Sequence, residues 1–127
     1  MTENEISREV VDSALKIHRV LPPGLLESVY RGFLAHELTL RGLTVERERP
    51  IPVTYEGHLM DIGFRADLIV GDKVIVEMKS IEEVADVHKK QLLTYLKLAD
   101  KRLGLLINFN VALIRDGITR TANRLIE

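Results

Sequence analysis

The sequence predicts an α/β domain built on a mixed β-sheet, and three observations point to it. Apolar residues recur at helical spacing before residue 42, they alternate with polar residues from 43 to 79, and an amphipathic helical segment then separates two short apolar runs. A strand, a helix and another strand in succession indicate a parallel crossover. The expected order is ααβββαβ followed by a small β tail, in a single domain over residues 1–127.

The N-terminal third is expected to hold two helices. Thr2 and Glu5 resemble a capping box at the start of a helix over residues 3–20. Pro22-Pro23-Gly24 ends this helix, because proline is not tolerated in a helix interior. A second helix should begin just beyond Gly24 and end near Arg41-Gly42, where glycine supplies a C-terminal cap.

The rest of the chain is expected to hold strands, one further helix and a closing hairpin. The strands should cover residues 44–55, 59–70, 74–79 and 103–107, the helix 84–101, and the hairpin should pair 111–114 with 118–120 around Asp116-Gly117. Pro50 and Pro52 indicate that the first strand is irregular or lies at an edge of the sheet, because proline cannot donate a ladder hydrogen bond.

Composition excludes several classes of protein and site. With 18 Lys and Arg against 19 Asp and Glu, the net charge of −1 gives no overall attraction to nucleic acid, so any polyanion site must be local. The lack of cysteine removes disulfides, thiolate metal sites and cysteine nucleophiles, and fits a reducing cytoplasm. No apolar run approaches the roughly 20 residues that cross a bilayer, and the acidic start is unlike a signal peptide, so no membrane partner is expected. We therefore expect a cytoplasmic protein.

Two carboxylates are predicted to meet across neighbouring strands. The apolar residues of these strands are expected to share one face, and they are Phe64, Ala66, Leu68, Val70, Val74, Val76 and Met78. A three-residue connection makes these apolar faces coincide, and it puts Asp67 opposite Glu77 and Arg65 opposite Lys79. A two-residue turn would instead put the two acids on opposite faces, so burial of the apolar residues favours the longer connection.

Opposed carboxylates repel one another unless a positive charge lies between them. A divalent cation is the simplest answer, since Asp and Glu oxygens suit Mg²⁺ or Mn²⁺. Lys79 shares the face of Glu77 and could hold a water molecule beside a phosphate, which together indicates metal-assisted phosphodiester hydrolysis. Alternatively, Glu77 and Lys79 form an ordinary surface ion pair and Asp67 merely ends a strand edge.

The spacing of these residues resembles a known motif. Asp67, followed after nine residues by Glu77-Met78-Lys79, is similar to the motif of the PD-(D/E)XK nuclease superfamily, whose αβββαβ core the predicted order also resembles. Gly24-Leu25-Leu26-Glu27-Ser28-Val29-Tyr30 resembles the signature of the bacterial and archaeal GxxExxY proteins, a family within that superfamily. The resemblance extends from Ile6 to about Asn123 and implies a restriction-endonuclease-like mixed β-sheet flanked by helices.

The resemblance also implies a set of catalytic residues. Glu27, Asp67, Glu77 and Lys79 would be catalytic. The three acids would hold Mg²⁺ or Mn²⁺ together with the main-chain carbonyl of Met78, and Lys79 would position or polarise the attacking water. One departure is that Ala66 rather than proline precedes the first acid of the motif.

Four further residues are candidates for supporting the site or binding substrate. Gln91-x-x-x-Tyr95 resembles a motif in the helix after the core of some superfamily exonucleases, and Tyr30 and Arg65 complete the set. Ordinary roles compete with these. Glu27 would also complement a helix dipole, Tyr30 fits an apolar stripe, and Gln91 and Tyr95 could simply bond to each other.

The resulting prediction is a magnesium-dependent nuclease that cuts DNA or RNA by means of a metal-activated water. An alternative of a different class is a non-catalytic module that binds nucleic acid or a protein on the same fold. A third is an ordinary α/β domain whose acids are surface charges. A homodimer is considered because many nucleases of this size need two copies to engage a duplex, although no heptad or exposed apolar helix demands one.

Overall fold

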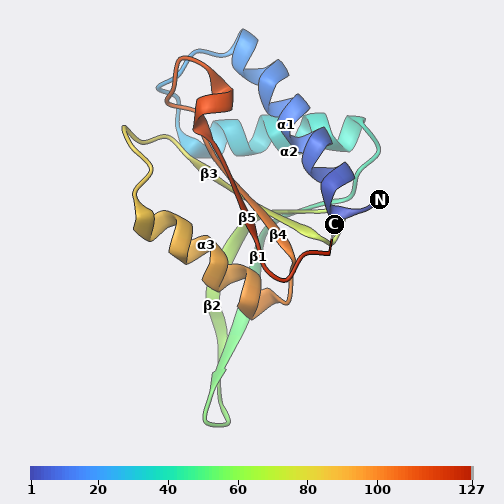
Figure 1. The fold of residues 1–127 in the computed structure, drawn as a ribbon, viewed down its shortest axis with the longest axis vertical. Coiled ribbons are helices and arrows are strands. Elements are labelled where there is room, and N and C mark those ends of the chain that lie inside the picture. Colours follow the sequence, from blue (N-terminus) through green and yellow to red (C-terminus); the bar gives the residue numbers. More distant parts are fainter. Residues whose placement is uncertain (127) are drawn as a thin grey trace.

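The computed structural model describes residues 1–126 and has helices on both faces of one sheet (Figure 1). The elements in chain order are α1 (Glu3–Val20), α2 (Glu27–Leu40), β1 (Val45–Tyr55), β2 (His58–Val70), β3 (Val74–Lys79), α3 (Asp86–Ala99), β4 (Leu103–Asn108), the 3₁₀ helix η1 (Ile114–Gly117) and β5 (Ile118–Ala122). The strands lie in the order β1-β2-β3-β4-β5. All neighbours are antiparallel except β3 and β4, which are parallel and connected through α3. The predicted mixed sheet is therefore confirmed.

The start of α1 and the turn into α2 follow the predicted signals. The Thr2 hydroxyl accepts a hydrogen bond from the Glu5 amide at 3.2 Å, and the Glu5 carboxylate accepts one from the Thr2 amide at 3.0 Å, which confirms the capping box. Tyr30 fixes the turn that follows, because its hydroxyl donates to the Pro22 carbonyl at 2.6 Å and accepts from the Leu25 amide at 3.2 Å. This brings the start of α2 back onto the body of the protein.

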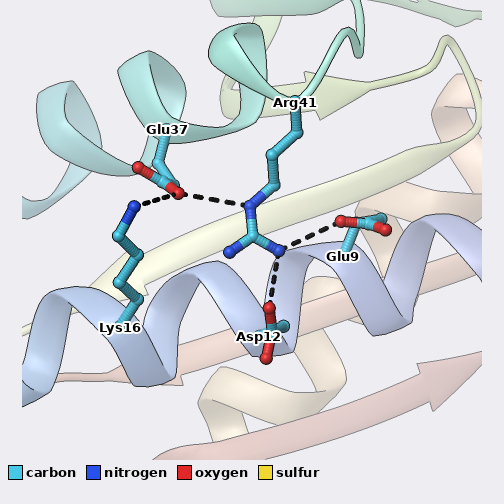
Figure 2. Close-up of polar contacts among 5 residues, drawn as sticks. All are labelled: Glu9, Asp12, Lys16, Glu37 and Arg41. Carbon is cyan, nitrogen blue, oxygen red and sulfur yellow. Dashed lines mark hydrogen bonds and ion pairs between the residues drawn. The ribbon is translucent and has the colours of Figure 1, made fainter.

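A network of charged side chains fastens α2 to α1 (Figure 2). One guanidinium nitrogen of Arg41 contacts Glu9 at 3.0 Å and Asp12 at 2.7 Å, both on α1. Another contacts Glu37 at 3.3 Å on its own helix, and Lys16 of α1 reaches the same Glu37 carboxylate at 2.9 Å. Single surface ion pairs stabilise little, but a network of this kind restrains the crossing of the two helices.

The sheet separates two apolar cores. On one face α1 and α2 pack against β2, β3 and β4, with Ile6, Val10, Ala14, Tyr30, Leu34, Leu38, Leu68, Val70, Val74, Val76, Met78, Leu105, Ile107 and Phe109 among the buried residues. On the other face α3 packs against Ile51, Phe64, Ala66, Ile69, Ile75 and Leu106 through Leu92 and Leu96. Because β3 and β4 are covered on both faces, nearly every residue in them is buried.

One predicted face of β2 is wrong. Leu68 lies on the face covered by α1 and α2 as expected, but Phe64 and Ala66 lie on the α3 face together with Ile69. The alternation changes between the pairs Arg47–Leu68 and Arg49–Ala66, where the register of β1 with β2 is kept but Glu48 and Asp67 are not paired. Glu48 has a φ of 49° at this point, and a left-handed residue interrupts the pleat of a strand. Asp67 therefore lies at a break in the sheet that the sequence pattern did not reveal.

The hairpin of β1 and β2 extends away from the rest of the molecule (Figure 1). The register shifts between Ile51 and Val53, next to Pro50 and Pro52, and β1 lies at an edge of the sheet, so the prediction of an irregular or edge strand is confirmed. Large apolar side chains are exposed near the tip of the hairpin, and they are Tyr55, Leu59, Met60 and Ile62.

The predicted closing hairpin is also wrong. Residues 111–114 form no strand, and Ile114–Gly117 forms the 3₁₀ helix η1, with Ile114 buried in the core. β5 pairs instead with β4, where Ile107 lies opposite Ile118 and Leu103 opposite Ala122. Asp116-Gly117 does mark a turn, but the strand that follows, β5, pairs with the free edge of β4. None of the helices within residues 1–126 is long and apolar enough to cross a membrane.

The return of the chain at Gly117 gives the first prediction. A Cβ atom at Gly117 would lie 2.1 Å from the carbonyl oxygen of Asn108, so Gly117→Ala forces the backbone to move. We expect the free energy of unfolding to fall by about 1–3 kcal/mol, as in other overpacked sites. Urea unfolding followed by circular dichroism measures it.

The matched control is Gly32→Ala in α2, where a Cβ would meet nothing within 4 Å. Alanine is the better helix former by up to about 1 kcal/mol, so this variant should be as stable as the wild type or more stable. Equal losses in both variants would contradict the close approach at Gly117.

Candidate active site

Asp67 and Glu77 come together where the pairing of β2 with β3 ends. The register has Val70 opposite Val74, as the three-residue connection predicts, and the ladder stops at Leu68 and Val76. Beyond this point the main-chain amides donate hydrogen bonds to side-chain carboxylates instead of to main-chain carbonyls. The Asp67 amide donates to the Glu77 carboxylate at 3.3 Å, and the Met78 amide donates to the Asp67 carboxylate at 2.9 Å. The acids are therefore neighbours, as predicted.

The expected pairing of Arg65 with Lys79 is wrong, because the ladder between β2 and β3 does not extend that far. Arg65 is exposed and pairs with Pro50 of β1 instead. Lys79 is partly buried and lies opposite Asn108 in the parallel pair of β3 and β4. The two cations consequently lie in different surroundings, Arg65 on an exposed strand and Lys79 beside the acids.

Glu77 is an unusually buried acid, with 9% of its surface exposed. Its burial raises the pKa of Glu77 well above the ordinary value, and hydrogen bonding to Asp67 and the charge of Asp67 raise it further. The amide of Asp67 and the charge of Lys79 act in the opposite direction. The positive charge near the pair therefore does not offset the burial of Glu77, and a bound cation would stabilise the charged form of both acids.

Tyr95 of α3 lies against the same pair of acids. Its ring stacks on Phe64 with centroids 3.8 Å apart and planes inclined by 3°. Partial burial raises the pKa of Tyr95, and the charges of Glu77 and Asp67 add to the effect. Gln91 lies one helical turn earlier and is exposed. The α3 helix therefore presents an aromatic wall near the acids and an amide toward solvent.

Glu27 approaches the site from α2. It is the first residue of that helix, and its carboxylate accepts a hydrogen bond at 3.3 Å from the amide of Ser80, the residue that follows Lys79. An open cavity of about 540 Å³ adjoins it, lined by Gly24, Leu25, Leu26, Glu27, Ser28, Ser80 and Asn110. Glu27 thus lies at the end of β3, next to space that a substrate could enter.

Tyr30 supports this part of the structure from within. It is fully buried, its ring stacks on Phe109 at 4.4 Å, and its hydroxyl is engaged by the turn before α2. Its side chain therefore holds the segment that leads to Glu27 and does not face the solvent.

Asn108 is a polar residue near the site that the sequence analysis did not select. It is buried at the end of β4, where its side chain accepts hydrogen bonds from the amides of Ile81 and Asn110 at 3.1 and 3.2 Å and donates one to the Ile81 carbonyl at 2.9 Å. The amide of Phe109 also donates to the Lys79 carbonyl at 3.0 Å. These bonds fix the chain directly after Lys79. The signal in the sequence that could have identified Asn108 is a polar residue at the end of an otherwise apolar strand.

Arg31 and Glu48 are two further residues that the prediction missed. One guanidinium nitrogen of Arg31 lies 3.5 Å from the Asp67 carboxylate, and another lies 2.8 Å from the Glu48 carboxylate. Arg31 follows Glu27 by four residues on α2, and this spacing puts both on one face of the helix. That spacing could have identified Arg31, whereas the left-handed backbone of Glu48 has no sequence signal.

The family of the protein follows from comparison with known sequences. A sequence model of the PD-(D/E)XK nuclease superfamily matches residues 4–121. The chain belongs to the PD-(D/E)XK nuclease superfamily. The five-stranded, mostly antiparallel sheet flanked by helices is consistent with its restriction-endonuclease-like fold, as predicted. Comparison with curated proteins and with solved structures gives no match. The closer resemblance to the GxxExxY proteins stays a prediction.

PD-(D/E)XK nucleases generally use divalent metals, and the donor set of this chain suits such an ion. Asp67 and Glu77 supply hard oxygen ligands, and burial raises the pKa of Glu77, so that a bound cation would favour its charged form. Within residues 1–126, however, no three His, Cys, Asp or Glu side chains are arranged as a group that could hold a metal. The structure thus brings Asp67 and Glu77 together, whereas Glu27 bonds to the amide of Ser80 and does not form a three-acid group with them.

The burial of Glu77 gives a prediction for the metal-free protein. Because the folded state raises the pKa of this acid above 4.5, the folded protein binds the proton more tightly than the unfolded chain. The contribution of Glu77 to the free energy of unfolding is therefore present in full below pH 4.5. It is lost as the pH rises toward the pKa of the folded state, by at most about 1.4 kcal/mol per pH unit. In Glu77→Gln, which cannot ionise, this loss should disappear.

The measurement is urea unfolding in EDTA at several pH values between about 5 and 8. Glu83→Gln is the control, because Glu83 is exposed and should leave the slope with pH unchanged. Parallel pH profiles for Glu77→Gln and the wild type would contradict a strained acid at this position.

Proposed function

We propose that this protein is a magnesium- or manganese-dependent nuclease that hydrolyses phosphodiester bonds in DNA or RNA, as a single domain over residues 1–127. The observation that carries the proposal is the pair of adjacent acids, the partly buried Asp67 and the buried Glu77, with Lys79 two residues further on β3. Two adjacent acids whose charge is only partly compensated are costly to bury, and perturbed acids of this kind are characteristic of functional sites. Membership of a nuclease superfamily gives the pair a chemical purpose.

The proposed cation ligands are the carboxylates of Asp67, Glu77 and Glu27 and the main-chain carbonyl of Met78. When bound, Mg²⁺ or Mn²⁺ would lower the pKa of a water molecule and neutralise charge that develops on the phosphate. Because Asp67 and Glu77 are held by main-chain amides of the facing strand, their oxygens need little reorganisation to receive the ion.

The remaining residues of the site have distinct proposed roles. The ammonium group of Lys79 donates a hydrogen bond to the attacking water and stabilises negative charge on its oxygen. That oxygen would form a bond to phosphorus as the bond to the ester oxygen breaks. The attacking water would release one proton to solvent, and the leaving oxygen would take up one proton from solvent. Gln91 and Arg65 are exposed and are proposed to bind substrate phosphates, while Tyr95 forms the wall on the α3 side.

Electrostatics limits how the protein would hold its substrate. With a net charge of −1 the chain has no general affinity for polyanions, so the local cations must act at the site itself. Cutting both strands of a duplex would need two active sites, and a homodimer is therefore part of the proposal. A cytoplasmic location rests on the absence of cysteine.

One observation favours the alternative of a non-catalytic binding module. The tip of the β1–β2 hairpin exposes three large apolar side chains, those of Tyr55, Leu59 and Met60. Binding to a nucleic-acid backbone does not require an apolar surface of this kind. Such a surface is typical of protein contacts. In that case the protein would bind a partner through the hairpin and would neither bind Mn²⁺ nor cut nucleic acid.

Calorimetry with Mn²⁺ tests the proposal without knowledge of the substrate. We expect the wild type to bind Mn²⁺ at neutral pH and Asp67→Ala to lose binding while keeping its circular dichroism spectrum, since the variant lacks one of two adjacent ligands. Asp61→Ala is the control, because Asp61 is an exposed aspartate on the same strand and should bind Mn²⁺ like the wild type. Unchanged binding in Asp67→Ala would place the ion elsewhere.

Lys79→Ala separates catalysis from binding. We expect this variant to fold and to bind Mn²⁺ but to cleave at least about 100-fold more slowly, because the attacking water loses its stabilising charge. Cleavage of single-stranded DNA, duplex DNA and RNA in Mn²⁺ measures it, with the exposed Lys97→Ala as the control. Cleavage by Lys79→Ala at the wild-type rate would rule out this role, and loss of the fold in both Asp67→Ala and Lys79→Ala would make the two residues structural.

A further inference from the structure

Asp67 is released from regular pairing on both sides of β2. Toward β3 the ladder stops at Leu68. Toward β1 the pairs on either side of Asp67 are regular, with Leu68 opposite Arg47 and Ala66 opposite Arg49. Glu48 occupies the gap on β1 with a left-handed backbone that non-glycine residues rarely adopt. Strained backbone of this kind is found mostly at functional sites, so the contacts of the Glu48 side chain are of interest for the function of the site.

Arg31 of α2 bridges the two residues at this break. Its guanidinium contacts Glu48 at 2.8 Å with one nitrogen and Asp67 at 3.5 Å with another. Its side chain is largely buried, with 21% exposed, whereas that of Glu48 is 58% exposed. The shorter contact is therefore with the more exposed residue, Glu48, and the longer contact is with the proposed metal ligand, Asp67.

The two oxygens of Asp67 have different partners. One accepts the short hydrogen bond from the Met78 amide at 2.9 Å, which fixes the carboxylate on β3. The other has the long contact with Arg31 at 3.5 Å. A cation bound at Asp67 would meet the positive charge of Arg31 within a few ångströms, and two like charges at that distance repel each other strongly in a partly buried site.

We infer that Arg31 is a positioning residue that serves as the counter-ion of Asp67 in the metal-free protein and yields this place to a divalent cation. The inference rests on the proposed function. Glu48 retains the displaced guanidinium through the shorter contact, so that Arg31 stays beside the site. The protein thereby keeps the pair of acids partly neutralised before the ion arrives, at the cost of a lower affinity for that ion.

The test compares Mn²⁺ binding by calorimetry in the wild type, Arg31→Gln and Arg31→Met. Removing the competing charge should tighten binding roughly tenfold at low salt, and the gain should shrink at high salt because mobile ions screen it. Arg31→Gln keeps a polar group near Glu48 and is the variant better suited to remain folded. A purely structural arginine would instead weaken binding or leave it unchanged when removed.

Arg49→Met is the matched control. Arg49 lies next to Glu48 on β1 but pairs with Glu46 at 3.2 Å and Asp72 at 3.5 Å, so its removal changes the net charge equally without touching Asp67. We expect its Mn²⁺ affinity to stay within about twofold of the wild type, since the charge of Arg49 is exposed, paired with other acids and screened by salt. Equal tightening in Arg49→Met and Arg31→Gln would overturn the specific role of Arg31.

The outcomes distinguish this inference from the proposed function. If the wild type binds Mn²⁺ through Asp67 but Arg31→Gln binds it no more tightly, the inference is overturned and the proposed function stands. If neither the wild type nor Arg31→Gln binds Mn²⁺, the proposed function fails and the inference fails with it. Tighter binding in Arg31→Gln alone, with the predicted salt dependence, supports both.

Discussion

The exchange of hydrogen bonds between Asp67 and β3 is the interaction on which the candidate site depends. A regular ladder would have used the main-chain groups of Asp67 and Glu77 for each other, with both side chains perpendicular to the sheet. Here the carboxylates accept the amide protons of Asp67 and Met78 instead. The same bonds that end the pairing of β2 with β3 therefore hold two acids together, so the site is built into the sheet and does not depend on a loop.

The two cores make this break in the sheet tolerable. β3 is covered on both faces and pairs along its whole length with β4, so it stays in place where β2 diverges from it. Around it, α2 delivers Glu27 and Arg31, α3 delivers Tyr95, and Asn108 fixes the chain after Lys79. Each of these elements is held in place by contacts away from the site, for example α2 by the charged network to α1.

Burying acids side by side is unfavourable, and the surroundings of Glu77 show how the chain limits the cost. Burial and the charge of Asp67 both favour the protonated acid, while Lys79 and, through Asp67, Arg31 provide partial compensation. A domain stabilised by only several kcal/mol has little reason to keep such a pair for the fold alone. The cost of keeping two acids adjacent is therefore consistent with a role of this pair in the proposed chemistry.

The sequence by itself determined the local features of this protein. The Thr2 cap, the break at Pro22-Pro23 and the apolar alternation that opposes Val70 to Val74 depend on neighbours in the chain. They were sufficient to predict the first two helices, the register of β2 with β3 as far as Leu68 and the adjacency of the acids, but not the change of face along β2. Only the tertiary structure decided that Arg31 meets Asp67 and that the last strand joins β4. Those contacts depend on which helix face and which strand edge remain available once the cores have packed. The residues involved lie far apart in the chain, so the local periodicity of the sequence does not predict these contacts.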